Sequence, residues 1–301
     1  MATTKAMDAA AAEIQPPLTV IDVKTSEALE SLLETISGLP TKLPSLYLDY
    51  QGPADGNVIT LCLFIPPNVI YRVLLGTRRS VDPSASNAMG VSLKTILESD
   101  YIPKVTFDVR SPSSVMFRHH GISLDGIRDL QLMELASRNA KQHKKYLTRF
   151  TKCVDHDIPS SNDVRKRWQD TSNVDDYHVF NVLGHAPRST MKRVEIYPTL
   201  YSIYYAKLHL SREAFWLCES RFQLQERVMA SQDTKFAVGK KDNALGPAVS
   251  YQHELREKAM ESWNERIKME RLAGEYELDD DADWVPIQGS TRLAPLQLLF
   301  G

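Results

Sequence analysis

The sequence has few cysteines and lacks the short motifs that mark the commonest nucleotide and hydrolase sites. Its three cysteines, Cys62, Cys153 and Cys218, lie far apart and form no Cys-x-x-Cys pair, which argues against a disulfide framework and a zinc knuckle. There is no Gly-x-Gly-x-x-Gly, no P-loop and no Gly-x-Ser-x-Gly elbow. The sequence therefore gives no support for Rossmann-type dinucleotide binding, P-loop nucleotide hydrolysis or α/β-hydrolase chemistry.

Charge of one sign and long hydrophobic runs are also missing. The formal net charge is −2, which excludes a uniformly basic surface for nucleic acid but allows a local basic face. No stretch approaches the length of a membrane span. The first residues include Asp8 and Glu13 and match neither a secretory signal nor an arginine-rich transit peptide. We therefore expect reduced cysteines, no membrane contact and a cytoplasmic or nuclear location.

What is present is an ordinary globular composition, with 43% hydrophobic and 25% charged residues. An Ala-rich stretch over residues 1–17 ends in Pro16-Pro17 and predicts a flexible leader. Residues 275–301 carry six acidic side chains against Arg292 alone and predict an acidic tail. Between them we expect one large domain over 18–232 and a helical extension over 233–274.

The first half of the chain alternates between β-rich and helical patterns. A β-prone run at 18–23 precedes a helix that Thr25 or Ser26 caps and that Gly38 ends. Three further runs with turn signals between them predict an antiparallel meander: 46–49, 58–65 and 69–75. A helix at 93–98, a strand at 104–109 and a helix from Ser111 or Ser113 to His119 follow. This order predicts an α/β fold with a central sheet.

From Asp129 onward the apolar spacing is helical, so the second half is predicted to be mostly helix. We expect further helices near 161–168, 196–210, 211–230 and 253–272. The segment from about 170 to 192 contains Gly184 and Pro187 and is expected to be a loop.

The order of short pieces in the first half carries a family resemblance. Leu46-Tyr47-Leu48-Asp49-Tyr50-Gln51-Gly52 is followed by the meander, then by Ser92 to Glu98, Lys104 to Arg110, His120-Gly121-Ile122 and Asp129 to Ala136. In this order and spacing the pieces resemble the DEDD superfamily of 3′-to-5′ exonucleases, in the ribonuclease-D-like branch that includes Egalitarian and exonuclease-domain proteins. The resemblance covers about 18–160 and resumes at Pro198-Thr199-Leu200-Tyr201. It implies a ribonuclease-H-like mixed sheet flanked by helices.

Enzymes of this family hold two divalent metal ions on four carboxylates, because Mg²⁺ and Mn²⁺ prefer oxygen ligands with net negative charge. The resemblance places the first motif, Asp-x-Glu, on Asp49-Tyr50-Gln51, which keeps the aspartate and replaces the glutamate by an amide. The aspartate of the second motif falls on Ser114. Ungapped placement of the third motif puts Arg193 on its aspartate and Ser189 on its tyrosine. Between Tyr177 and Arg212 the sole carboxylate is Glu195.

The resemblance therefore implies a degenerate active site made of Asp49, Gln51, Ser114, Arg193 and Glu195, with no metal site and no cofactor. We interpret Asp108 and Arg110 as a salt-bridged strand end and Asp129 as a helix N-cap. A second set of residues recurs every three or four positions and shares a face if the helix is continuous: Arg138, Lys141, Lys145, Arg149 and Lys152. Phosphate contacts from such a face give salt-sensitive binding of nucleic acid, and a solvated helix surface explains the pattern equally well.

The leading hypothesis is a catalytically inactive, exonuclease-like protein that binds single-stranded RNA or DNA, or a protein partner, with a homodimer as a further possibility. An alternative is a weak or atypical 3′-to-5′ exonuclease that uses Asp49, Glu195 and Asp108 with one Mg²⁺ or Mn²⁺. A further alternative is a cleft that has been repurposed for chemistry on a small molecule.

Overall fold

The strands of the central sheet place their side chains alternately on its two faces, and each face packs into a hydrophobic core. The computed structural model describes residues 18–52, 59–76, 80–139, 141–172, 188–210, 213–236, 241–272, 276–278 and 284–286. Within these ranges one mixed six-stranded sheet has the order β1-β4-β3-β2-β5-β6. Its strands are β1 (Thr19–Val23), β2 (Leu46–Gln51), β3 (Ile59–Ile65), β4 (Val69–Leu75), β5 (Lys104–Thr106) and β6 (Ile127–Asp129).

The predicted meander is confirmed, since β2, β3 and β4 pair antiparallel. The strand β1 pairs parallel to β4, and β5 lies parallel to both β2 and β6. The fold class is therefore the one that the motifs implied: a mixed sheet with flanking helices and a helical C-terminal half. The leader expected at 1–17 lies outside the described residues.

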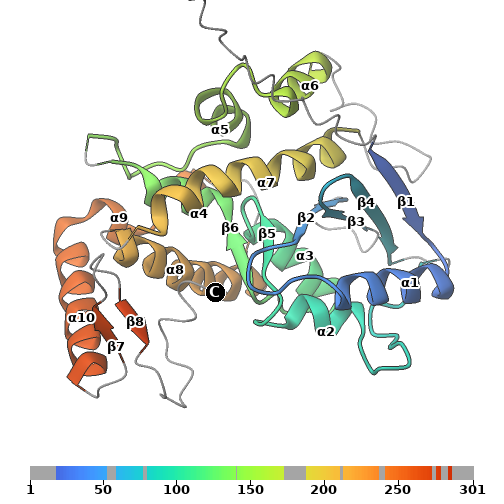
Figure 1. Ribbon diagram of the computed structural model, residues 1–301, viewed down its shortest axis with the longest axis horizontal. Coiled ribbons are helices and arrows are strands. Elements are labelled where there is room, and N and C mark those ends of the chain that lie inside the picture. Colours follow the sequence, from blue (N-terminus) through green and yellow to red (C-terminus); the bar gives the residue numbers. More distant parts are fainter. Residues whose placement is uncertain are drawn as a thin grey trace, which may run out of the picture.

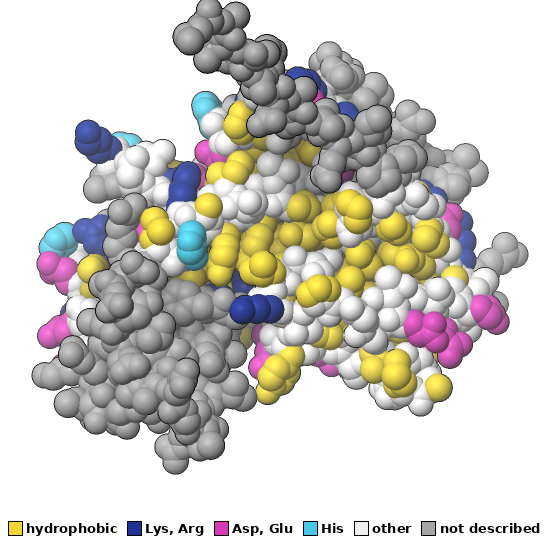
Figure 2. All heavy atoms as spheres, in the orientation of Figure 1, with side chains coloured by type: hydrophobic (Ala, Val, Ile, Leu, Met, Phe, Trp, Pro, Cys, Tyr) yellow, Lys and Arg dark blue, Asp and Glu magenta, His cyan; other side chains and the backbone are white. Residues whose placement is uncertain are grey.

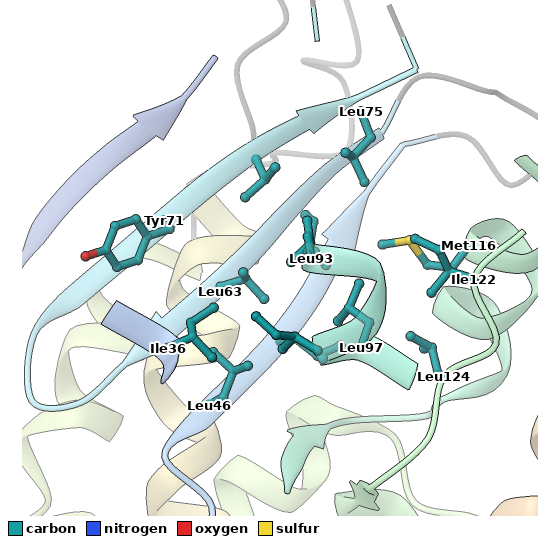
Figure 3. Packing of buried hydrophobic residues seen from close by; sticks show 14 of the residues in the cluster. Ile36, Leu46, Leu63, Tyr71, Leu75, Leu93, Leu97, Met116, Ile122 and Leu124 are labelled. Carbon is teal, nitrogen blue, oxygen red and sulfur yellow. The ribbon is translucent and has the colours of Figure 1, made fainter. Parts of the chain in front are cut away.

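The first hydrophobic core lies on the face of the sheet that carries α1 (Ser26–Ser37), α2 (Leu93–Glu98) and α3 (Arg110–His120). Figure 3 shows Ile36, Leu63 and Leu97 meeting between these helices and the strands. Local signals position the helices. Thr25 caps α1 and Ser92 caps α2 with a reciprocal capping box, so their start points follow from the sequence.

The second core lies on the opposite face, beneath α7 (Arg188–Leu208), as Figure 1 shows. Around it lie α4 (Leu130–Ser137), α5 (Phe150–Asp157), α6 (Asp163–Ser172) and α8 (Ala214–Gln232). The helix expected from 196 begins earlier, at Arg188, and runs through Pro198. Burial of Val194, Ile196 and Tyr197 in this core stabilises the turn that precedes the proline.

The C-terminal part contains α9 (Ala248–Tyr251), α10 (His253–Leu272) and a short 3₁₀ helix, Lys241–Ala244. The helix α10 matches the range that its apolar spacing predicted. Inside the segment expected as an acidic tail, β7 (Tyr276–Leu278) pairs antiparallel with β8 (Trp284–Pro286), and the rest of that segment lies outside the described residues. Among the helices that the structure describes, none is long and apolar enough to cross a membrane.

Two expectations about local structure are wrong. The strand predicted at 104–109 stops at Thr106, because Asp108 adopts a left-handed backbone with φ 61° and α3 starts two residues later. The continuous helix on which Arg138 to Lys152 would share a face is not formed. Arg138 ends α4 in an extended conformation with ψ 136°, and the next helix, α5, begins only at Phe150. The five basic residues therefore share no helix face.

Candidate functional site

Asp49 is the centre of the candidate site, and it is enclosed by protein groups. It lies on β2 at an odd-numbered position, like Tyr47, so its side chain points to the α7 face. Only 4% of the residue is exposed. Its Oδ1 accepts the Tyr50 backbone N–H at 2.9 Å, and its Oδ2 accepts the Tyr197 hydroxyl at 3.0 Å. The Arg193 Nε lies 3.2 Å from the same Oδ2.

Electrostatics at this carboxylate reflect its burial and its cationic neighbour. Burial raises the pKa of Asp49, and the Arg193 guanidinium opposes that rise. Burial also raises the pKa of Tyr197 well above its usual value, so the phenol keeps its proton and donates a hydrogen bond to the carboxylate. The side chain of Arg193 thus supplies, from within the protein, the positive charge that a bound cation supplies in a metal site.

An aromatic wall holds Arg193 in place. The guanidinium carbon lies 5.0 Å from the centre of the Phe150 ring, a cation–π contact. Phe150 in turn makes edge-on contacts with Phe107, Trp168 and Tyr197, at centroid distances of 5.3, 5.3 and 5.8 Å. The start of α5 and the middle of α7 are thereby packed around the ion pair, which closes the site from this side.

The two neutral replacements lie on the elements that the resemblance assigned to them. Gln51 follows Asp49 by two residues on β2 and therefore faces the same side of the sheet. Its Oε1 is buried, and within the described part of the chain it has no hydrogen-bond partner. Ser114 lies on α3 and is 2% exposed. Neither side chain carries the negative charge that a divalent metal ion requires.

The other carboxylates near the site are each held by an arginine. Glu195 accepts from Arg167 Nε at 3.0 Å and Nη2 at 2.6 Å, on the α6 side of α7. Asp108 accepts from Arg110 Nε at 2.6 Å and Nη2 at 2.7 Å, the salt-bridged strand end expected from the sequence. Among the described residues, no group of three His, Cys, Asp or Glu side chains is placed to hold a metal ion.

Asp129 is the N-cap of α4, as predicted, and it also joins two other segments. It accepts the Gln131 N–H at 2.9 Å, as a cap does, and the N–H groups of Asp108 and Val109 at 3.0 and 3.1 Å. Arg227 of α8 donates to it at 3.0 Å. This aspartate therefore fixes the end of β6, the turn before α3 and the face of α8 relative to one another.

The predicted basic face is dispersed. Arg138 is engaged inside the protein, where it donates to both Glu134 oxygens at 2.8 and 2.6 Å and to the backbone oxygen of Tyr146. The other four remain exposed on the loop after α4 or on α5: Lys141, Lys145, Arg149 and Lys152. Lys145 lies 5.6 Å from the Tyr146 ring centre and 6.0 Å from that of Tyr251.

Sequence reasoning placed Arg193 on a ligand position but missed Tyr197 and Phe150. Arg193 and Tyr197 are four residues apart, so they share a face of α7, and that spacing was the available signal. Phe150 lies 43 positions before Arg193 in the sequence, and nothing local marks its role. The side chain of Ser189, the other residue placed in the third motif, lies outside the described residues.

No protein-family model matches this sequence, and no curated protein matches it in a sequence search. Solved structures do match. Ribonuclease D from Trypanosoma brucei has 15% identity, covers 77% of this chain and 80% of its own, and gives a TM-score of 0.51. Its complex with GMP has 12% identity, covers 89% of this chain and 83% of its own, and gives a TM-score of 0.53. Its complex with RNA U12 has 13% identity, covers 76% of this chain and 80% of its own, and gives a TM-score of 0.50.

These likenesses show the fold. The chain has the fold of the 3′-to-5′ exonucleases of the ribonuclease D type, as the order of its motifs indicated.

Proposed function

We propose that this chain, which has a ribonuclease-D-like fold, binds single-stranded nucleic acid without cutting it. One observation carries the proposal: the Asp49 carboxylate, the remaining acid of the first motif, is bound by Arg193 and Tyr197 from α7. A two-metal mechanism needs several carboxylates that converge on the ions. Here a guanidinium lies against the sole carboxylate among the four ligand positions.

The charge balance supports the loss of catalysis. A divalent cation entering beside Asp49 meets the guanidinium of Arg193 at close range, with the neutral side chains of Gln51 and Ser114 at the other ligand positions. Displacing Arg193 leaves that cation with a single carboxylate. Mg²⁺ and Mn²⁺ bind weakly to such a site, because their affinity follows the number of anionic oxygen ligands.

The binding half of the proposal rests on the relative and on the exposed basic side chains. The ribonuclease D of T. brucei has been solved with RNA U12 and with GMP, which shows that the relative's fold accommodates nucleotides. In this chain Lys141, Lys145, Arg149 and Lys152 stay exposed and available for phosphate contacts. Such contacts are independent of base sequence and weaken steeply with salt.

The decisive experiment separates cutting from binding. Purified protein is incubated with 5′-labelled single-stranded RNA and DNA in Mg²⁺ or Mn²⁺, and binding to the same oligonucleotides is followed by fluorescence anisotropy in EDTA. We expect full-length oligonucleotides after incubation, together with salt-sensitive binding. Metal-dependent shortening that disappears in Asp49→Ala would refute the loss of catalysis. Absence of binding at low salt would refute the binding half and favour a protein partner.

A calorimetric titration with Mn²⁺ provides an independent check. We expect no heat of tight binding, and Asp49→Asn should titrate like the wild type, because Asp49 contributes no metal site. A stoichiometric Mn²⁺ site that is lost in Asp49→Asn contradicts the proposal and favours the atypical exonuclease.

A further inference from the structure

The loop between α4 and α5 and the start of α5 carry positive charge without an acid in the same segment. From Arg138 to Lys152 the sequence contains six lysines and arginines and no Asp or Glu. Four of the six are exposed: Lys141, Lys145, Arg149 and Lys152. Figure 2 shows Lys, Arg and His side chains at the upper left edge of the molecule, where Figure 1 draws this loop. Such a concentration of one charge attracts anionic ligands.

Tyr146 lies in the same loop and is 57% exposed. The Nζ atom of Lys145 is 5.6 Å from the centre of the Tyr146 ring and 6.0 Å from that of Tyr251 on α9. The ammonium group is thus within cation–π distance of two aromatic rings. This arrangement places a phosphate-binding charge next to an exposed ring on which a base can stack.

A buried arginine holds the backbone of the loop from inside the protein. Arg138 Nη1 donates to the backbone oxygen of Tyr146 at 2.8 Å and to that of His143 at 2.5 Å. The guanidinium is itself fixed by both carboxylate oxygens of Glu134. The position of Tyr146 is therefore set by a bond to the interior, although its side chain points into solvent.

The segment 244–246 holds the loop from its other side. The N–H of Leu147 donates to the backbone oxygen of Ala244 at 2.9 Å, and the N–H of Gly246 donates to that of Lys145 at 2.8 Å. A Cβ added to Gly246 would lie 2.9 Å from Cδ2 of Leu135 and 3.1 Å from a backbone oxygen of the loop, so this close approach needs glycine. A ring on a backbone held from both sides loses little further freedom when a ligand binds.

Lysines and an exposed ring on one anchored loop have the chemistry that recognises single-stranded nucleic acid. Proteins that bind single strands combine cations along the phosphate backbone with rings on which bases stack. The bases of a duplex are stacked on one another and paired, so they offer no free face to such a ring. An acidic peptide satisfies the lysines but brings no base to the tyrosine.

We propose that Tyr146 stacks on an unpaired base of single-stranded nucleic acid, while Lys145 binds the phosphate next to that base. This inference rests on the proposed function, since it names the residues that contact the nucleic acid. It adds an aromatic contact to the exposed cations of that proposal and makes binding selective for single strands. Asp49 and the ligand positions that the resemblance assigned take no part.

The first test compares two exposed tyrosines in different electrostatic surroundings. Tyr101 is 74% exposed, lies between α2 and β5, and follows an acid, Asp100. Binding of a fluorescein-labelled single-stranded RNA in EDTA is measured by anisotropy for both variants. We expect Tyr146→Ala to weaken binding about tenfold and Tyr101→Ala to leave it unchanged. Equal binding by the two variants overturns the proposal.

The salt dependence separates the contribution of the ring from that of the charge. Lys145→Gln should reduce the slope of log affinity against log salt by roughly 0.7, because one phosphate contact is lost. Tyr146→Ala should keep the slope of the wild type and lower the affinity at every salt concentration, because stacking releases no counterions. An unchanged slope in Lys145→Gln, or a reduced slope in Tyr146→Ala, overturns the assignment of the two roles.

Changes of the ring and of the ligand identify what is bound. Tyr146→Trp should bind the RNA at least as tightly as the wild type, because stacking needs the ring and not the hydroxyl. Tyr146→Ala should leave the binding of duplex RNA unchanged, and a tenfold loss there overturns the selectivity for single strands. Poly-glutamate should bind more weakly than the RNA. Tighter binding of poly-glutamate overturns the nucleic-acid assignment and indicates an acidic protein partner.

A measurement on the wild type guards against misfolded variants. RNA carrying 4-thiouridine is photocrosslinked to the unmodified protein, and the crosslinked peptides are mapped by mass spectrometry. We expect crosslinks within 143–149, and crosslinks confined to other segments overturn the site. The two proposals fail differently. Shortening of the RNA refutes the loss of catalysis, absence of binding refutes the binding half of the proposed function, and binding that ignores Tyr146 refutes this site alone.

Discussion

The hydroxyl of Tyr197 donates to Oδ2 of Asp49 at 3.0 Å, and Tyr197 is fully buried, while Asp49 is 4% exposed. Removing the hydroxyl leaves a buried carboxylate oxygen with the Arg193 contact alone. We expect Tyr197→Phe to lower the free energy of unfolding by about 1–3 kcal/mol, measured by urea denaturation.

Tyr204 offers a matched control for that variant. Its hydroxyl also donates to a carboxylate, Oδ2 of Asp157 at 2.7 Å, but Asp157 is partly exposed and water replaces the lost donor. We expect Tyr204→Phe to cost less than about 1 kcal/mol. A larger loss in Tyr204→Phe than in Tyr197→Phe contradicts the view that the Asp49 contact is a buried structural bond.

Restoring acids at the two neutral positions should not restore activity. The double variant Gln51→Glu and Ser114→Asp places carboxylates on β2 and α3, but Arg193 still lies against Asp49. We expect no Mn²⁺-dependent shortening of labelled RNA and a less stable protein, since both new charges are added at buried or partly buried positions. Shortening by the double variant that needs Mn²⁺ contradicts this expectation.

Lys104 predicts a pH dependence of stability. It is fully buried, its Nζ donates to the backbone oxygens of Ile96 and Ser99, and burial lowers its pKa to about 7. In the unfolded chain a lysine titrates near pH 10.4, so between these values the unfolded state binds more protons than the folded state. The free energy of unfolding therefore rises through Lys104 as pH increases from 7 toward 10, because the unfolded state loses its extra proton over this range.

The variant Lys104→Met removes the titration and isolates this effect. Between pH 7 and pH 9 the free energy of unfolding of the wild type should rise relative to that of Lys104→Met by about 2 kcal/mol. Urea denaturation of both proteins at the two pH values measures the difference. The same pH dependence in both proteins means that Lys104 keeps an ordinary pKa in the folded state.

Arg138 should be a stability residue and not a nucleic-acid contact. Its side chain is 9% exposed, and its partner Glu134 is 11% exposed. Arg138→Met leaves that carboxylate and two backbone oxygens of the following loop, those of His143 and Tyr146, without this donor. We expect a loss of about 3 kcal/mol in the free energy of unfolding. Lys141→Met, three residues on and exposed, should change stability by less than about 0.5 kcal/mol.

The loop after α4 shows what the sequence can and cannot predict. The recurrence of Arg138, Lys141, Lys145, Arg149 and Lys152 fits a helix by spacing alone. The chain instead leaves the helix at Arg138, where the guanidinium turns back to Glu134 and draws the backbone of the following loop toward it. Helical periodicity in charged residues does not report such tertiary bonds, because an exposed helix face and a folded loop have similar compositions.

Local signals were sufficient where the structure depends on neighbours in sequence. Thr25 and Asp129 cap helices at the predicted places because a cap is a bond across two or three residues. The three-residue strand β6 went unpredicted, since its pairing with β5 and not its own pattern makes it a strand. In the candidate site the loss of carboxylates was visible in the sequence. The enclosure of Asp49 by Tyr197 and Phe150 depends on packing between distant segments.

The bond between Asp49 and Tyr197 spans 148 positions of the chain. During synthesis, the strand that carries Asp49 is made long before the helix that covers it. Until α7 arrives, that face of the sheet and its carboxylate remain open to water. Closing so long a loop is entropically costly and slow, so the central sheet must be held together first by the nearby pairs of its meander. A truncated chain that stops before residue 188 would therefore present an unshielded aspartate and an uncovered apolar surface to any chaperone it met.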